Sequence, residues 1–265
     1  MRAGLLRWLW RGYIAAAVMF VFAPVLSLLI FSFQASRVQS FPITAFTMDW
    51  YRNAWENPEV RTGLQNSIVV GVIAGLAAAI LGFLSAHLLA RGKLRYGNLY
   101  VALVSLPAFV PLLLSGIALL MYYQRIRLAG SLWAIIAAHS CFCSPFAMAV
   151  IRGPYERLNI DIEHAARNLG AGGFRIMFQI VLPQLWPAIA AGMLISFLLS
   201  WDEFILAWFV GGFQRTLPVV IYGMMGASFN PSLNAVGVVS IAISGLMLGA
   251  VFLLEGLATR RARTT

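Results

Sequence analysis

Six long runs of apolar residues alternate along the chain with shorter segments that hold most of its charged side chains. A helix that crosses a membrane needs about 20 mostly apolar residues. The runs that meet this length are Tyr13–Phe33, Ser67–Leu89, Leu99–Tyr123, Leu132–Ile151, Leu185–Trp208 and Ala235–Leu257. The pattern therefore predicts an all-α integral membrane protein with about six transmembrane helices.

The composition supports this class and argues against a soluble enzyme. Hydrophobic residues make up 61% of the chain and charged residues only 11%, whereas a typical globular domain has about 25% charged residues. So few charges cannot cover the surface of a soluble protein of 265 residues. We expect one membrane domain with no soluble module attached.

The net charge of +10 follows the predicted topology. Most of the 19 basic residues lie at the two termini and in two alternate loops: Arg2, Arg7, Arg11, Arg91, Lys93, Arg95, Arg152, Arg157, Arg167, Arg175, Arg260, Arg261 and Arg263. Membrane proteins keep such clusters in the cytoplasm, so both termini are predicted to lie inside. The basic residues form no stripe with interleaved aromatic residues, which argues against a nucleic-acid partner.

The same topology assigns the connecting segments to the two sides of the membrane. Cytoplasmic loops are expected at Arg91–Gly97 and Arg152–Pro183, and external ones at Gln34–Asn66, Arg125–Gly130 and Phe209–Asn234. Pro107 and Pro111 are expected to kink the third helix, which a membrane protein tolerates when neighbouring groups satisfy the freed backbone.

The predicted cytoplasmic loop 152–183 is the most informative part of the sequence. An amphipathic helix is expected over Ile160–Leu169, with Asn159 or Asp161 as its N-cap and Gly170 as its stop. Such a helix on the cytoplasmic face would suit the docking of another protein. An ordinary solvated connection between two spans is the alternative.

A second short helix is expected over Phe174–Val181, ended by Pro183. The whole loop closely resembles the Glu-Ala-Ala loop of permease subunits of type I bacterial ABC importers. That family pattern is Glu-Ala-Ala, three residues, Gly, nine residues, Ile, one residue and Leu-Pro. Its positions fall on His164, Ala165, Ala166, Gly170, Ile180, Leu182 and Pro183. The resemblance implies that this loop seats in a groove of a cytoplasmic ATPase.

The chain departs from the family pattern at the glutamate, which is replaced by His164, with an acid one residue earlier at Glu163. Our first hypothesis is that Glu163 carries the acidic contact to the ATPase. Consecutive positions are about 100° apart around a helix, so Glu163 would need a modest rotation to replace its neighbour. Alternatively His164 makes the contact, or neither does and the apolar residues Ile162, Ala166 and Leu169 dock.

Three further segments resemble the spermidine/putrescine branch of these permeases. They are Ser200-Trp-Asp-Glu-Phe-Ile-Leu-Ala-Trp-Phe-Val-Gly-Gly, Thr216-Leu-Pro-Val-Val-Ile-Tyr and Asn230-Pro-Ser-Leu-Asn-Ala. The resemblance implies a permease subunit of an ATP-driven importer in the bacterial inner membrane, for a polyamine or a related organic cation. A permease of the same family for another small solute is the alternative.

The resemblance also implies the partners of the chain. These are a second permease subunit, two copies of a cytoplasmic ATP-binding subunit, an extracytoplasmic solute-binding protein and membrane lipid. No cofactor is expected in this chain, because ATP is bound by the ATPase. The resemblance extends from about Thr62. Three parts are therefore expected: a first helix with an external loop (1–61), a permease domain with the coupling loop 152–183 (62–257), and a basic cytoplasmic tail (258–265).

Trp201, Asp202 and Glu203 lie near the outer end of the fifth predicted helix. An acid in a membrane helix costs about 2.5–3.5 kcal/mol at the midplane and less near the interface, so it is a candidate functional residue. Two carboxylates flanked by Trp201 and Trp208 would suit an organic cation through ion pairing and cation–π contact. The alternative is that the acids anchor the helix end or pair with a nearby arginine.

A membrane-embedded metal enzyme is the alternative from another class, with His139, Cys141 and Cys143 as ligands. Residues at i, i+2 and i+4 do not share one helix face, so no metal site is expected and the cysteines are expected to be small buried hydrophobes. A stand-alone channel is a third possibility. The only lysine, Lys93, follows no glycine-rich phosphate loop, so the chain is not expected to hydrolyse ATP.

Overall fold

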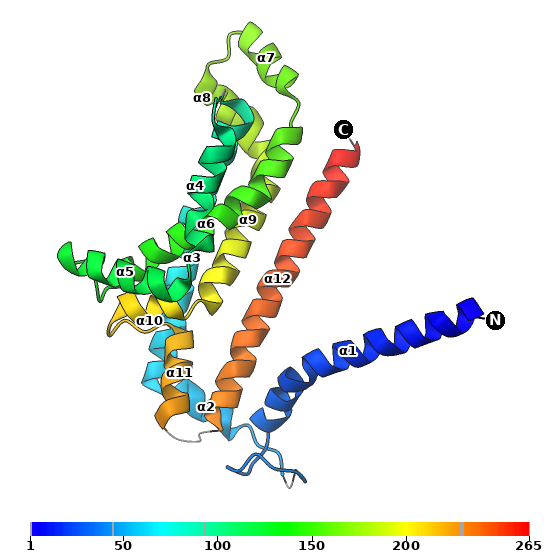
Figure 1. Cartoon of the computed structure of the whole chain (residues 1–265), viewed down its shortest axis with the longest axis vertical. Coiled ribbons are helices and arrows are strands. Elements are labelled where there is room, and N and C mark those ends of the chain that lie inside the picture. The colour runs from blue at the N-terminus through cyan, green and yellow to red at the C-terminus, as the bar shows by residue number, and fades with distance from the viewer. Residues whose placement is uncertain (1, 44, 93, 228–230, 265) are drawn as a thin grey trace. The chain divides into compact units, whose positions relative to one another are not determined.

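The computed structural model describes residues 2–43, 45–92, 94–227 and 231–264. Within these ranges nearly all of the ordered structure is helical (Figure 1). The chain forms two compact units, one made of Met1–Arg61 and Ile221–Ala242, the other of Thr62–Val220 and Ile243–Thr265.

The first unit holds α1 (Arg2–Ser32) and α2 (Asp49–Glu56). None of the apolar window of α1 is buried, so its side chains are available to lipid or to a partner helix. The segment between the two helices is tied down by Trp50, whose indole N–H donates to the backbone oxygen of Gln34 at 2.7 Å.

The second unit holds most of the remaining helices. Their bounds are α3 Pro58–Arg91, α4 Gly97–Phe109, α5 Leu112–Arg125, α6 Leu132–Arg157, α7 Ile160–Asn168, α8 Gly173–Ile176, the π-helical η1 Met177–Val181, α9 Leu182–Asp202 and α10 Ile205–Gly211. Two further helices, α11 (Leu217–Ala227) and α12 (Ser232–Thr264), contribute residues to both units, as α3 does through residues 58–61.

A stripe of small residues lets α3 pack closely against its neighbours. Ala74, Ala78 and Ala86 are fully buried at intervals that keep them on one face of the helix. Gly82 lies on the same face, and a Cβ added there would lie 2.6 Å from the backbone nitrogen of Met148. Small residues at such positions allow the backbones of membrane helices to approach each other. The stripe therefore makes α3 a packed element of the second unit rather than a lipid-facing one.

Among the described residues, five helices are long and apolar enough to span a membrane, or six if one bent pair counts as a span. The prediction of an all-α chain with about six spans is therefore confirmed. The bent pair is α4 and α5, which meet at 93°. Only a kink was predicted here. The helix instead breaks because Pro111 has no N–H, and because a residue before proline, here Val110 with φ −76° and ψ 132°, favours an extended backbone.

The fifth span differs from the prediction at both ends. The short helix that was predicted to end at Pro183 continues through it, and Gly173–Asp202 forms one candidate span. Its π-helical turn carries a bond from the N–H of Leu182 to the oxygen of Met177, five residues back. This wider turn accommodates Pro183, which has no N–H and crowds the preceding turn of a regular helix. At the other end the span stops at Asp202 rather than at Trp208.

Two predicted external loops contain helices. The segment Gln34–Asn66 includes α2 and the first turns of α3, and Phe209–Asn234 includes the apolar helix α11. The polar side chain of Asn66 donates to the backbone oxygen of Arg215 at 2.9 Å. The hydroxyl of Ser67 accepts from the N–H of Leu217 at 2.8 Å. These two bonds join the beginning of α3 to the start of α11.

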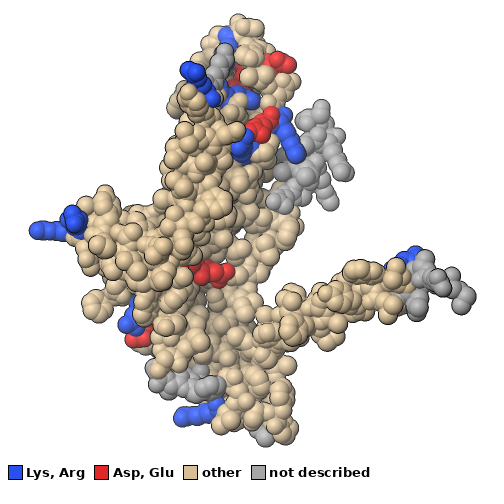
Figure 2. Space-filling model, in the orientation of Figure 1, with Lys and Arg blue, Asp and Glu red and all other residues tan. Residues whose placement is uncertain are grey.

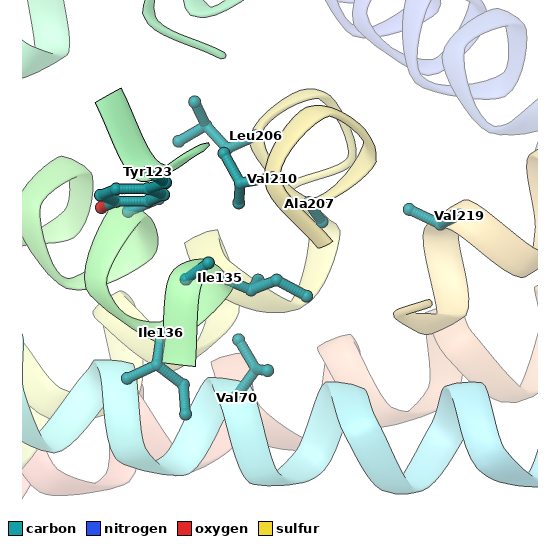
Figure 3. Close-up of a cluster of buried hydrophobic side chains, with 10 residues drawn as sticks. Val70, Tyr123, Ile135, Ile136, Leu206, Ala207, Val210 and Val219 are labelled. Carbon is teal, nitrogen blue, oxygen red and sulfur yellow. The ribbon is translucent and has the colours of Figure 1, made fainter. Parts of the chain in front are cut away.

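A buried apolar cluster positions α10 (Figure 3). Val70 of α3 and Ile135 and Ile136 of α6 are packed together with Leu206 and Val210 of α10. All five side chains are at most 6% exposed. The short helix α10 is therefore part of the core of the second unit, and the corner between α9 and α10 is held from one side by this packing.

Candidate functional sites

The helix α7 begins where the sequence predicts and ends one residue before the predicted Leu169. Asn159 is its N-cap, because its side-chain oxygen accepts from the N–H of Asp161 at 2.9 Å. Gly170 follows its end with φ +84°, a conformation that is open to glycine and costly for residues with a Cβ. No atom lies within 4 Å of the place where that Cβ would be, so the requirement for glycine comes from the backbone alone.

The hydrogen bonds beyond the last turn of α7 form a Schellman motif. The N–H of Gly170 donates to the oxygen of Arg167 at 2.9 Å, and the N–H of Ala171 donates to the oxygen of Ala166 at 3.0 Å. This pair of bonds satisfies carbonyl groups that a helix end leaves open. The boundary of α7 is therefore fixed by its own backbone.

Glu163 points inward. All residues of α7 lie in the described part of the chain, and Glu163 is the one that is buried. Its Oε1 accepts from Nε of Arg91, the last residue of α3, at 2.8 Å, and the two side chains are 4% and 13% exposed. Arg167 lies 3.9 Å from the other oxygen. The carboxylate is therefore occupied within the chain, and the hypothesis that Glu163 reaches an ATPase is not supported by the geometry.

Arg91 also contacts two groups from the beginning of the loop 152–183. Its Nη2 donates to the backbone oxygen of Leu158 at 3.0 Å, and its guanidinium lies 5.2 Å from the centroid of the Tyr155 ring. The Tyr155 hydroxyl is in turn 2.6 Å from Nδ1 of His87, one turn before Arg91 in α3. The end of α3 is thus bound both to the end of α6 and to α7.

The opposite face of α7 is exposed. His164 and Ala165 lie at the surface, and Ile162 and Leu169 are 43% and 88% exposed. On the face drawn in Figure 2, charged side chains gather at the α7 end of the second unit, while the surface over α4 is uncharged. Of the alternatives for docking, His164 is accessible, and so are Ile162 and Leu169 of the three apolar residues, whereas Ala166 is partly buried.

Three of the remaining motif residues anchor the loop to a buried apolar cluster. Ala166, Ile180 and Leu182 pack against the buried cluster of Phe83, Ala86, Ile151, Tyr155, Ile176, Val181 and Leu185. Pro183 is exposed. The family pattern is thus divided between an exposed face of α7 and an anchored part at η1 and the start of α9.

At the other end of α9, Glu203 caps the next helix. Its Oε1 accepts from the N–H of Ile205 at 2.9 Å, and its Oε2 accepts from the N–H groups of Leu206 and Ala207 at 2.8 and 3.3 Å. A carboxylate at a helix N-terminus satisfies open N–H groups and interacts favourably with the helix dipole. Glu203 is 6% exposed, so this capping site is almost closed to solvent.

A buried histidine completes the site around Glu203. Nε2 of His139 lies 3.2 Å from Oε2 of Glu203, off the line of a good hydrogen bond. Nδ1 of His139 is 2.7 Å from the hydroxyl of Ser200. His139 is fully buried. The three side chains therefore tie α6, the last turn of α9 and the start of α10 together.

The three predicted solute-path residues have different surroundings. Trp201 is 1% exposed, and its ring stacks on Phe197 with centroids 5.8 Å apart. Glu203 is turned inward to α10, whereas Asp202 is exposed. Only Asp202 presents its carboxylate to the surface, so the structure separates the two acids that the sequence places side by side.

The residues of the metal-enzyme alternative do not converge. Cys141 is exposed and Cys143 is buried. Cys143 packs with Ala78 and Ala147, while His139 is engaged by Ser200 and Glu203. Within the described residues, no group of three His, Cys, Asp or Glu side chains could hold a metal ion. Cys143 thus matches the predicted small buried hydrophobe, whereas Cys141 does not.

Residues 67–262 match the family described as binding-protein-dependent transport system inner membrane component. The chain belongs to this family. It is a multi-pass inner-membrane permease, a transport subunit rather than a catalytic one. The metal-enzyme alternative is not favoured.

Individual relatives agree with this assignment. The spermidine/putrescine transport system permease protein PotC of Escherichia coli strain K12 is 30% identical over 245 residues, which cover 89% of this chain and 90% of the relative. The putrescine transport system permease protein PotI of the same strain is 31% identical over 240 residues, covering 88% and 83%. A probable molybdenum ABC transporter permease of Haloferax volcanii is 28% identical over 211 residues, covering 77% of each chain.

Solved structures show the same fold. A bacterial ABC transporter involved in the import of the acidic polysaccharide alginate matches with a TM-score of 0.73 at 18% identity, covering 94% of both chains. The MetNI methionine ABC transporter matches with a TM-score of 0.58 at 18% identity, covering 76% of this chain and 94% of that one. The type I importer permease fold is thus confirmed.

Sequence reasoning missed the groups that hold the two inward acids. Arg91 was assigned only to the positive cytoplasmic clusters, and His139 was considered only as a metal ligand. Both lie far along the chain from the acids that they meet. A long-range pairing of this kind has no local sequence pattern, although a lone histidine inside an apolar run was already a sign of a buried polar partner.

Proposed function

We propose that this chain is one of two permease subunits of an ATP-driven importer, and that its solute is a small organic cation of the polyamine class. The observation that carries the proposal is the similarity, at 30% and 31% identity over almost nine-tenths of the chain, to two permeases named for spermidine and putrescine. Both termini and the loop 152–183 lie in the cytoplasm, which the distribution of basic residues supports.

Two copies of a cytoplasmic ATPase drive this importer, one docking on the exposed face of α7, and an extracytoplasmic protein delivers the solute. The exposed Ile162 and Leu169 supply apolar contacts, and His164 replaces the family glutamate at the surface. Closure of the ATPases moves the loop and switches the path between inward-facing and outward-facing states. A fold neighbour, the bacterial alginate ABC transporter, was solved in complex with a periplasmic protein that holds an alginate pentasaccharide, which supports the presence of the delivering partner.

Asp202 is the proposed cation contact in the solute path. It is the last residue of α9, and a carboxylate at a helix C-terminus is unfavourable for the helix dipole. Its position therefore brings no benefit to the helix, whereas a passing cation would be attracted to it. Trp201 and Glu203, the other two candidates, contribute to the path by holding Asp202 in place.

The segments are assigned to three parts within this proposal. Residues 1–61 form the first membrane helix and an external segment, 62–257 form the permease domain with the coupling loop, and 258–265 form a basic cytoplasmic tail. The tail carries Arg260, Arg261 and Arg263, which favour the cytoplasmic side of the membrane.

The test is a thermal-shift screen of the cognate solute-binding protein against spermidine, putrescine, amino acids and molybdate, followed by uptake into proteoliposomes that hold the complete transporter. A shift with the polyamines and their ATP-dependent uptake are expected. A shift and uptake with molybdate alone would assign the transporter to an oxyanion, as the name of the Haloferax relative suggests, and would refute the cation.

A further inference from the structure

The helix α7 is joined to α8 by a short segment that is rich in glycine. On its C-terminal side the chain runs through Leu169, Gly170, Ala171 and Gly172 before α8 begins at Gly173. Glycines are conformationally permissive, so this link transmits force poorly. A movement of α7 caused by a docked protein would therefore not reach the membrane helices through this segment unless another contact transmits it.

The Arg91–Glu163 pair is such a contact. It joins α7 directly to the end of α3, with Nε and Oε1 2.8 Å apart and both side chains almost closed to solvent. The same guanidinium holds the oxygen of Leu158, just before α7 begins. Arg91 therefore contacts this region at two points, one within α7 and one just before its first residue.

The same loop offers a contrasting ion pair. Arg152 and Glu156 lie 2.6 Å apart on α6, four residues apart, but their side chains are 38% and 46% exposed. Exposed pairs of this kind contribute little, because water and salt screen them and long side chains lose freedom. A buried pair is different, because removing one partner leaves the other charge without compensation. Burial, not distance, singles out Arg91 and Glu163.

The helix that receives the contact reaches the opposite end of the unit. The 34 residues of α3 extend about 50 Å at about 1.5 Å per residue. Its alanine and glycine stripe packs it into the core, and its first turns hold the start of α11 through Asn66 and Ser67. A displacement of the Arg91 end is therefore passed along a rigid, packed element.

We propose that Arg91 and Glu163 form a clamp that makes α7 move together with α3, so that ATPase closure is transmitted to the membrane domain. The proposal rests on the proposed function and deepens it. Both are positioning residues, and neither contacts the ATPase. The clamp accounts for the displaced acid in the family pattern: at position 163 the carboxylate faces α3, while position 164 faces outward.

The test uses the complete transporter in proteoliposomes and measures solute uptake and ATP hydrolysis together. For Glu163→Gln we expect uptake per ATP to fall about 10-fold or more, while ATP hydrolysis stays within about 2-fold of wild type. The matched control is Glu156→Gln, which removes the exposed pair and should leave the ratio unchanged. The swap Arg91→Glu with Glu163→Arg should restore at least part of the ratio.

Three outcomes would overturn the clamp. The first is an unchanged uptake-per-ATP ratio in Glu163→Gln. The second is an equal fall of uptake and hydrolysis with loss of assembled transporter and no rescue by the swap, which would indicate a purely structural pair. If Glu163→Gln does not assemble, Arg91→Lys is used instead, because lysine keeps the charge but not the fork of donors. The third outcome is a wild-type uptake-per-ATP ratio in Arg91→Lys.

A second readout needs no solute and separates this proposal from the proposed function. Spin labels at Asn168 of α7 and Thr62 of α3, both exposed, report their separation by electron spin resonance, with Cys141 replaced by serine. Addition of ATP should leave the distance distribution unchanged in the wild-type background, because the clamp makes α7 and α3 move together, and should change it in Glu163→Gln. The same result in both backgrounds would refute the clamp, whereas failure of wild-type polyamine uptake would refute only the solute.

Discussion

Two pairs of adjacent polar residues, one in α7 and one at the end of α9, have contrasting surroundings. At α7, Glu163 is buried beside the exposed His164, and at the end of α9, Glu203 is buried beside the exposed Asp202. In both pairs one residue is held by contacts within the fold and the other is exposed at the surface. Adjacency in sequence therefore says little about shared function.

The two buried acids are compensated in different ways. Glu163 meets a full positive charge on another helix, at 2.8 Å. Glu203 meets three backbone N–H groups and a histidine ring. The first arrangement joins two helices that are distant in sequence, and the second fixes a local corner. The first is therefore suited to transmit movement and the second to hold a fixed geometry.

The largest effect on stability is expected for Glu163→Ala. Breaking a buried ion pair by removing one partner costs about 3–5 kcal/mol, because Arg91 is left buried and uncompensated. Thermal unfolding of the detergent-purified subunit measures the loss. The control is Glu156→Ala, for which an exposed pair predicts about 0–1 kcal/mol. Equal losses in the two variants would show that burial does not distinguish the pairs.

Removal of the cap at the α9–α10 corner should cost less. Glu203→Ala leaves buried N–H groups of α10 unsatisfied, and each such group costs about 1–3 kcal/mol. Water entering the space left by the side chain can satisfy some of them, so we expect a total of about 2–3 kcal/mol. Glu203→Gln keeps one acceptor oxygen and should recover part of the loss in the same unfolding experiment. Identical losses for both variants would argue against capping.

The end of α7 should show a backbone effect. Gly170→Ala is expected to cost about 1–2 kcal/mol, because φ is +84° and a Cβ is disfavoured in that region. Gly172→Ala is the matched control, since it also has open space for a Cβ but a φ of −71°. Hydrogen exchange of the α7 amides measures the local loss. Equal protection in the two variants would contradict the Schellman end.

The smallest effect on stability is expected for Asp202→Asn, at most about 0.5 kcal/mol, because the side chain is exposed. Uptake of a cationic solute should nevertheless fall about 10-fold, since the path loses its exposed carboxylate. Asp49→Asn, an exposed acid at the start of α2, is the control and should leave uptake unchanged. Wild-type uptake in Asp202→Asn would remove this residue from the solute path.

Much of the fold is predictable because its signals are local. Apolar runs of sufficient length locate the spans, and Asn159 and Gly170 mark the ends of α7 through capping and backbone conformation. The position of the break after Val110 was predicted, but the large angle between α4 and α5 was not, since this angle depends on the packing around the proline. The continuous helix through Pro183 was missed, because a π-turn depends on geometry that no simple pattern reports.

The candidate sites could be located from sequence but not oriented. The family pattern marked the loop 152–183 as the candidate coupling loop, and the rarity of acids in membrane helices marked Asp202 and Glu203 as candidates. Which neighbour faces inward depends on residues at distant positions, Arg91 for Glu163 and His139 for Glu203. Those partners are brought close only by the packing of α3 and α6, so their roles emerge with the tertiary structure.

The most direct test of the clamp is a double-mutant cycle of Arg91→Gln and Glu163→Gln, followed by thermal unfolding of the purified subunit and by binding of the ATPase. Residues in contact show interaction energies of about 0.5–3 kcal/mol, and for this buried pair we predict at least about 1 kcal/mol in stability. Neither single variant should gain or lose a direct ATPase contact. Additive effects on stability, together with about 10-fold weaker ATPase binding for Glu163→Gln alone, would show that Glu163 faces the ATPase and would contradict the account.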